Sequence, residues 1–133
     1  MDDLFRFPTA RRRDPEIEAW FAHGDALRGL IEPWFERLRA CGSDVRELIH
    51  DWRPTACVED AAFAYVDAYA EHANIGFLFG AFLDDPAGLL EGAGKRMRHV
   101  KLRMGRMPDE AALGDLVIAA YRDMRRRLDE ARP

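Results

Sequence analysis

The chain has 133 residues, of which 48% are hydrophobic and 11% aromatic, and this composition suffices for one buried core. The formal net charge of −4 at pH 7 argues against nucleic acid as a partner, because each phosphate contact requires a cation. No apolar run approaches the roughly 20 residues that span a bilayer, and the N-terminus lacks the basic-then-apolar order of a signal peptide. We therefore expect a cytoplasmic protein that does not enter a membrane, with Cys41 and Cys57 as thiols rather than a disulfide.

The N-terminal part of the sequence predicts an arm followed by a helix. Residues 1–13 contain Pro8 and three consecutive arginines without helical periodicity, so we expect a flexible arm ahead of one domain, residues 14–133. Asp14 followed by Pro15 is typical of an N-cap and the first helical position. The first helix is therefore predicted to begin here.

A second helix is predicted from apolar residues at i, i+3, i+4 and i+7 spacing, which are Leu27, Leu30, Ile31, Trp34 and Leu38. Pro33 lies inside this pattern and should kink the helix before it ends at Gly42. Ser43 is typical of another N-cap, so residues 45–49 are expected to form a short helical turn.

From Thr55 onward the pattern changes to short β-branched and aromatic segments. These predict four strands, Thr55–Glu59, Phe63–Ala70, Asn74–Phe82 and Arg96–Leu102. Short connections make the first three an antiparallel meander. In the second strand, alternation places the bulky Phe63, Tyr65, Asp67 and Tyr69 on one face and small residues on the other, which we expect helices to cover, with Gly76 allowing their close approach.

The C-terminal part of the sequence predicts one long helix. Pro108-Asp109 is a helix start, and apolar residues recur at helical spacing from Leu113 to Leu128. The predicted fold class is α+β: N-terminal helices, a mainly antiparallel sheet of about four strands, and a C-terminal helix packed on the sheet.

The stretch from Phe63 to Arg103 contains, in order, FAYVD, HANIGF, DPAGLLEGAGK and MRHVKL. This run resembles the YdhG-like family of small bacterial proteins, which is defined by a domain of unknown function. The resemblance extends from the helices near Trp20 to the last helix. It implies a single α+β domain. Because some members are described as frataxin-like iron chaperones, it also implies iron as a candidate ligand, held by acidic residues on the first helix.

The sharpest local motif is a glycine-rich loop that leads directly into the last predicted strand. Backbone N–H groups near Gly92 and Gly94 can converge on a phosphate or carboxylate, with Lys95, Arg98 and His99 beside them. The alternative is that the glycines only form a turn and the cations are solvated. The loop is not a nucleotide-binding P-loop, because the lysine is followed by arginine and a strand.

Arg98 also falls on the apolar side of its predicted strand. Burying a guanidinium without a counter-ion is costly, so we expect it to meet Asp67, Glu91 or an external anion.

Two sets of residues are candidate metal ligands. His72, His99, Asp84 and Asp85 form a mixed nitrogen and oxygen set if the last two strands pair, although histidines at strand ends are more often hydrogen-bonding residues. The acids of the first helix form the second set, which the resemblance to iron chaperones brings forward: Asp14, Glu16 and Glu18. The three arginines directly before them should weaken cation binding.

We therefore predict a non-enzymatic binding or carrier protein, with iron chaperone as its most specific form. One alternative is an enzyme or binder for a small anionic ligand held by Lys95 and Arg98, with His99 or His72 as general acid or base. Another is a homodimeric protein-interaction module that uses Trp52 or an exposed strand edge. Iron as a cofactor follows from the resemblance alone.

Overall fold

Five antiparallel strands form one sheet in chain order, β1-β2-β3-β4-β5, in the computed structural model, which describes residues 3–132. The strands are β1 (Val45–His50), β2 (Arg53–Val58), β3 (Ala61–Ala68), β4 (Ala73–Phe77) and β5 (Arg98–Leu102). The helices are α1 (Pro15–Ala22), α2 (Ala26–Arg39) and α3 (Glu110–Ala131), with a short 3₁₀ turn, η1 (Gly80–Phe82). This arrangement confirms the predicted α+β class and adds one strand to the predicted sheet.

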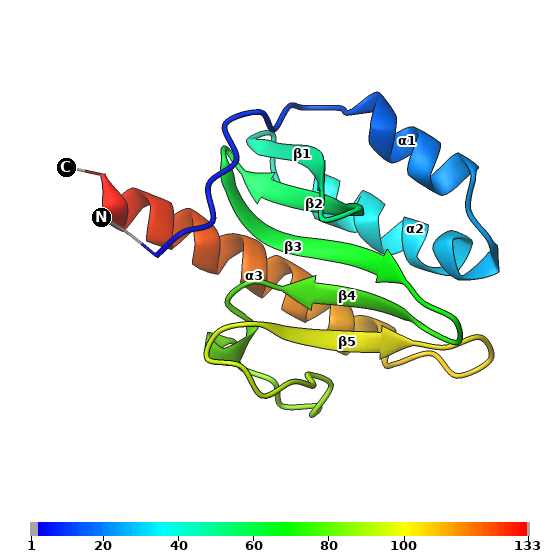
Figure 1. Cartoon of the computed structure of the whole chain (residues 1–133). Coiled ribbons are helices and arrows are strands. Elements are labelled where there is room, and N and C mark those ends of the chain that lie inside the picture. The colour runs from blue at the N-terminus through cyan, green and yellow to red at the C-terminus, as the bar shows by residue number, and fades with distance from the viewer. Residues whose placement is uncertain (1–2, 133) are drawn as a thin grey trace.

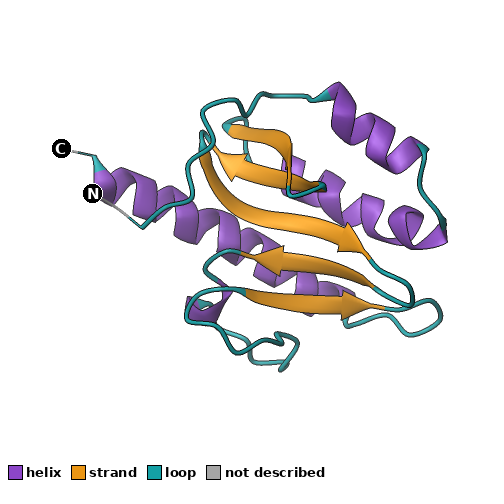
Figure 2. Cartoon of the chain, viewed as in Figure 1, coloured by secondary structure: helices purple, strands orange, loops and turns teal. Residues whose placement is uncertain are grey.

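Two helices cover one face of the sheet. In Figure 1, α2 and α3 both lie behind the strands, while α1 lies beyond the edge formed by β1. The core fills the space between them with fully buried side chains, among them Ile31, Phe35, Val66, Ile75, Leu113 and Met124. Figure 2 shows that no helix crosses the opposite face, which leaves that face to loops and the N-terminal arm.

The helices begin where the capping residues predict. The Asp14 carboxylate accepts a hydrogen bond from the Glu16 N–H at the start of α1, with Pro15 in the first helical position. Asp109 likewise accepts from the Ala112 N–H at the start of α3. Within residues 3–132, no helix has the combination of length and hydropathy that a membrane crossing requires.

The helical turn predicted after Ser43 is wrong, because this segment forms β1. Glu47 is only 1% exposed, and its carboxylate lies against the guanidinium of Arg39, with 2.6 Å from Nε to Oε1. A glutamate at an inward position interrupts the alternation of apolar residues between Val45 and Ile49. The strand is therefore not recognisable from its own sequence, because the partner of its buried charge is Arg39 on α2.

The predicted face of Phe63 is also wrong. The β2–β3 register shifts between Ala56 and Cys57, which is a bulge that places one extra residue in β3. Phe63 consequently packs against α3, with its ring centroid 5.9 Å from that of Tyr121. Tyr65 lies on the opposite, helix-free face, so the two aromatic residues are separated by the sheet.

Gly76 allows a close approach, although not to a helix as predicted. It is the cross-strand partner of Tyr65, and a Cβ on Gly76 would overlap the Tyr65 ring. The missing side chain therefore lets the tyrosine lie flat on the open face of the sheet.

Two strand boundaries differ from the prediction at the sheet end near η1. The predicted strand from Asn74 to Phe82 stops at Phe77, and the last strand begins at Arg98 instead of Arg96. Gly80 packs against the backbone of Arg98, where an added Cβ would be 2.7 Å from the Arg98 Cβ. The chain turns at this contact, so Leu78 and Phe79 are buried in a turn and not in a strand, while Phe82 is exposed.

The N-terminal arm has no helix, as predicted, but it is held against the sheet. The Phe7 N–H donates to the Asp60 carbonyl at 2.7 Å, and the Ala62 N–H donates to the Phe5 carbonyl at 2.9 Å. Further along, Arg11 exchanges two backbone hydrogen bonds with Glu47 in β1. Residues 1 and 2 of the predicted arm lie outside the described residues. The remainder of the arm forms one wall over the open face.

Candidate functional site

The arm and the open face of the sheet enclose a cleft of about 130 Å³. Its walls combine aromatic and aliphatic side chains with a small number of polar groups, the composition that is usual for a small-molecule site. It is lined by Phe5, Phe7, His50, Asp51, Arg53, Thr55, Ala62, Tyr65, Leu78 and Met97.

Strand pairing brings the residues of the cleft together from distant parts of the sequence. Thr55 in β2 pairs with Tyr65 in β3, and His50 pairs with Arg53 across the β1–β2 hairpin. Cross-strand partners point to the same side of a sheet, so these side chains share the open face. The arm then adds Phe7, whose ring centroid is 4.4 Å from that of His50.

Arg53 is the central cation of the cleft. Its guanidinium carbon lies 3.8 Å from the centroid of the Tyr65 ring, a stacked cation–π contact. No carboxylate of residues 3–132 forms an ion pair with it at 4.0 Å or less. The arginine is therefore oriented by an aromatic ring while its charge remains available to an anion.

Tyrosine hydroxyls supply donors near this cation. Burial raises the pKa of Tyr65, although the charge of Arg53 opposes the shift. The pKa of Tyr69 is also raised, first by burial and then by the charge of Asp67. Both phenols consequently keep their protons at neutral pH. The Tyr69 hydroxyl is already hydrogen-bonded to Asp67, so the donor that a ligand in the cleft can meet is Tyr65.

A polar row continues from the cleft across the open face. Cross-strand pairing places Asn74 between Asp67 and Lys101. The Oδ1 atom of Asn74 is buried, and no donor within the described residues bonds to it. The row thus provides acid, amide and amine groups beside the aromatic cleft.

The thiols are not candidate nucleophiles. Burial raises the pKa of Cys57 to about 12 and that of Cys41 to about 11. Both cysteines are therefore protonated at neutral pH, and neither lies in the cleft.

The glycine-rich loop has the wrong polarity for the predicted anion cradle. The Arg98 Nη1 atom donates to the carbonyl oxygens of Gly94, at 2.6 Å, and Met97, at 2.7 Å. Carbonyl oxygens thus converge on an internal cation, where an anion site requires converging N–H groups. Lys95 is exposed, and Gly92 has a φ of +127°, which suits a turn.

The predicted ion pair of Arg98 with Asp67 or Glu91 is likewise wrong, because backbone carbonyls take the place of a carboxylate. Glu91 instead lies 3.6 Å from the amine of Lys101. A loop that folds back on its own arginine satisfies the guanidinium locally, and no sequence pattern indicates that the loop folds back.

The two histidines of the predicted mixed metal site, His72 and His99, lie close enough for the charge of His72 to affect the pKa of His99. β4 and β5 pair, and the pKa of His99 is lowered, first by burial, with Lys101 and His72 contributing and Glu91 opposing. The acids do not join them as ligands: Asp85 accepts from the N–H groups of Leu89 and Leu90, and Asp84 is exposed. Among residues 3–132, no three His, Cys, Asp or Glu side chains converge as metal ligands.

The acidic residues of α1 have internal partners. Asp14 caps the helix and lies 3.2 Å from Arg11, while Glu18 pairs with Arg39 at 2.9 Å and Arg13 at 3.2 Å. Glu16 is exposed. Arginines thus neutralise most of the acidic surface that the resemblance to iron chaperones implies as an iron site.

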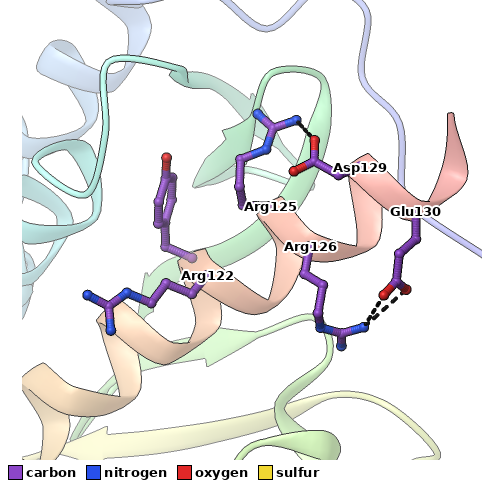
Figure 3. Close-up of a pocket in the computed structure, with 6 residues that line it drawn as sticks. Arg122, Arg125, Arg126, Asp129 and Glu130 are labelled. Carbon is purple, nitrogen blue, oxygen red and sulfur yellow. Dashed lines mark hydrogen bonds and ion pairs between the residues drawn. The ribbon is translucent and has the colours of Figure 1, made fainter.

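A broad hollow of about 450 Å³ lies on the exposed surface of α3. Figure 3 shows Arg125 directed at Asp129 and Arg126 directed at Glu130, so these cations are already paired. Arg122 extends from the same helix without reaching those acids. This surface resembles a solvated helix face, and the enclosed cleft is the stronger candidate site.

Most residues of the cleft carry no sequence signal that marks them as a site. Phe5 and Phe7 fall in the predicted flexible arm, and Arg53 precedes the predicted strand Thr55–Glu59. The pairing of Tyr65 with Gly76 lets the tyrosine ring lie on the open face, but this pairing depends on the strand register, which no local sequence pattern indicates.

None of the protein-family models, curated proteins or solved structures compared with this chain matches it. The resemblance to the YdhG-like family therefore stays a prediction from sequence motifs, and the cleft itself must supply the argument for function.

Proposed function

We propose that this protein is a non-enzymatic binding or carrier protein whose ligand is a small organic anion held in the cleft. The observation that carries the proposal is Arg53, a cation without an ion pair among residues 3–132, stacked on Tyr65 in a site that combines aromatic and aliphatic side chains with a small number of polar groups. A planar guanidinium offers two parallel N–H donors to a carboxylate or phosphate, and such bonds are among the strongest in proteins.

The size of the cleft limits the apolar part of this ligand. An apolar cavity of about 150 Å³ holds benzene, so a cleft of about 130 Å³ accommodates a ring or a short chain. Phe5, Phe7 and Met97 supply the apolar wall, and the anionic group meets Arg53. A small carboxylate with an apolar body fits both requirements.

The proposal is tested by titrating isotopically labelled protein with benzoate and following backbone amide NMR peaks. We expect shifts at Phe7, Arg53 and Tyr65, weaker shifts with acetate, and none with benzyl alcohol, which lacks the charge. Replacing Arg53 by Met should weaken benzoate binding about 10-fold or more, because a charge-assisted hydrogen bond is lost.

The matched control is Arg122→Met, an exposed arginine on α3, which covers the other face of the sheet. This variant should bind benzoate like the wild-type chain. Equal binding by the Arg53→Met variant, or benzoate shifts confined to residues outside the cleft, would contradict the proposal.

Iron carriage remains the more specific prediction that the family resemblance implies. An anaerobic titration with ferrous iron against a magnesium control tests it in the same spectra. Paramagnetic broadening at Asp14, Glu16 and Glu18, or at His72 and His99, supports an iron site. Unchanged peaks at stoichiometric iron reject it and leave the organic anion as the candidate ligand.

A further inference from the structure

The hairpin between β1 and β2 has an unusual turn. Asp51 and Trp52 connect the paired residues His50 and Arg53, and both have positive φ angles, 51° and 67°. Two left-handed residues are the signature of a type I′ turn, which strongly favours asparagine and glycine. A bulky side chain in this conformation is an outlier, so tryptophan is a costly choice for the second turn position.

Packing of the ring does not compensate this cost. Trp52 is 89% exposed, which is the highest exposure among the large hydrophobic residues that the structure describes. The fixed contact is made by its backbone, because the Trp20 Nε1–H of α1 donates to the Trp52 carbonyl at 3.0 Å. Helix α1 thus holds the turn in place while the indole remains in solvent.

The turn adjoins the candidate cleft. Asp51 and Arg53, the residues on either side of Trp52, both line it. Strained backbone that the surrounding structure maintains is concentrated at ligand clamps and active sites. An exposed tryptophan on strained backbone, adjacent in sequence to the stacked cation of a cleft, therefore suggests contact with a ligand.

We propose that Trp52 closes over the bound ligand and that this ligand is planar, an aromatic or conjugated carboxylate. The inference rests on the proposed function of the cleft. A planar ligand is expected because the walls of the cleft are themselves planar groups. Arg53 already stacks on Tyr65, and the ring centroids of Phe7 and His50 are 4.4 Å apart. A flat anion extends this stack, and the indole covers its solvent side, where stacking between rings contributes binding energy beyond area burial.

The test measures the Kd of benzoate for the full chain and for Trp52→Gly, Trp52→Leu and Trp52→Phe. Binding should weaken about 10-fold in the Gly and Leu variants and stay within about threefold of wild type in the Phe variant, because phenylalanine retains a planar ring. Phe82→Leu is the matched control, since Phe82 is 59% exposed, packs against Arg127 of α3 and is not among the residues that line the cleft. Cyclohexanecarboxylate, which has a similar size but is not planar, should bind the wild-type chain more weakly than benzoate.

A second readout follows the indole directly. Benzoate should lower the quenching of wild-type tryptophan fluorescence by acrylamide, because Trp52 is exposed whereas Trp34 is buried. This protection should disappear in the Trp52→Phe variant, which still binds benzoate.

The outcomes separate this inference from the proposed function. If benzoate binding depends on Arg53 but is unchanged in Trp52→Gly, the role of Trp52 is rejected and the cleft stands. If benzoate does not bind the wild-type chain, both are rejected. If Trp52→Gly instead abolishes self-association of the chain, the hairpin is a subunit contact, and the ligand role is overturned.

Discussion

At the residue scale, the most buried charge is Glu47, which accepts from Arg39 Nε at 2.6 Å, Arg39 Nη2 at 2.7 Å and the Asp14 N–H at 3.0 Å. These bonds connect α2, β1 and the start of α1. Desolvation of the two charges offsets much of their attraction, so the pair matters chiefly because neither residue can lose its partner.

Replacing Arg39 by Met should therefore destabilise the fold by about 3–5 kcal/mol, because Glu47 is left buried without a counter-ion. The double variant Arg39→Met with Glu47→Leu should recover more than half of this loss. Urea unfolding followed by circular dichroism measures both changes, with the exposed Arg126→Met as control. A double variant less stable than Arg39→Met would show that the charges contribute net stability.

A second charged cluster, which contains Asp44, Glu59 and Arg125, predicts a pH-dependent stability. Hydrogen bonds from Tyr121 and Arg125 outweigh the opposing effect of burial and lower the pKa of Asp44. The pKa of Glu59 is lowered first by its hydrogen bond from Arg125. A carboxyl whose folded pKa is depressed stabilises the fold above its unfolded pKa and loses that contribution as pH falls through the folded value.

Arg125→Met should consequently lower the free energy of unfolding at pH 7, and this effect should shrink as the pH falls through the depressed folded pKa values of Asp44 and Glu59, where both carboxyls become protonated. The measurement is the unfolding free energy of wild type and variant from pH 7 down to the lowest pH at which both chains are folded. A difference that stays constant over this range would mean that the arginine acts by packing alone.

At the element scale, the β1–β2 hairpin and the β3 bulge define the cleft. The bulge sends Phe63 to the helices and Tyr65 to the open face, while the hairpin brings His50 and Arg53 opposite each other. Both features depend on backbone geometry that a regular alternation of residues does not encode.

The strain in this hairpin predicts that Trp52→Gly stabilises the protein by about 1 kcal/mol, because glycine adopts a positive φ without steric cost. Trp52→Ala keeps the strained backbone and removes the exposed ring, so it should remain close to wild type. Thermal unfolding of the three proteins provides the comparison. A glycine variant less stable than the alanine variant would contradict a strained turn.

At the scale of the whole molecule, the two longest helices are both on one side of the sheet, and the opposite side is closed only in part by the arm. One face is therefore committed to the core, while the other carries Arg53, Tyr65 and the polar row. A fold that covers a single face of its sheet leaves the second available for a ligand.

The sequence by itself determined the elements whose signals are local. Asp14 and Asp109 marked two helix starts, and short polar connections between apolar segments gave the antiparallel meander. Capping bonds and tight turns join residues that are close along the chain, so a short segment of sequence is enough to predict them.

Only the tertiary structure decided where β1 lies, what satisfies Arg98 and which residues meet in the cleft. Glu47 can enter a strand because Arg39 of α2 neutralises it, and Phe7 can line a site because Asp60 holds its backbone. Each of these outcomes depends on a partner distant in sequence or on the return of a loop. Such contacts contribute free energy only after the chain has folded, so no local sequence pattern indicates them.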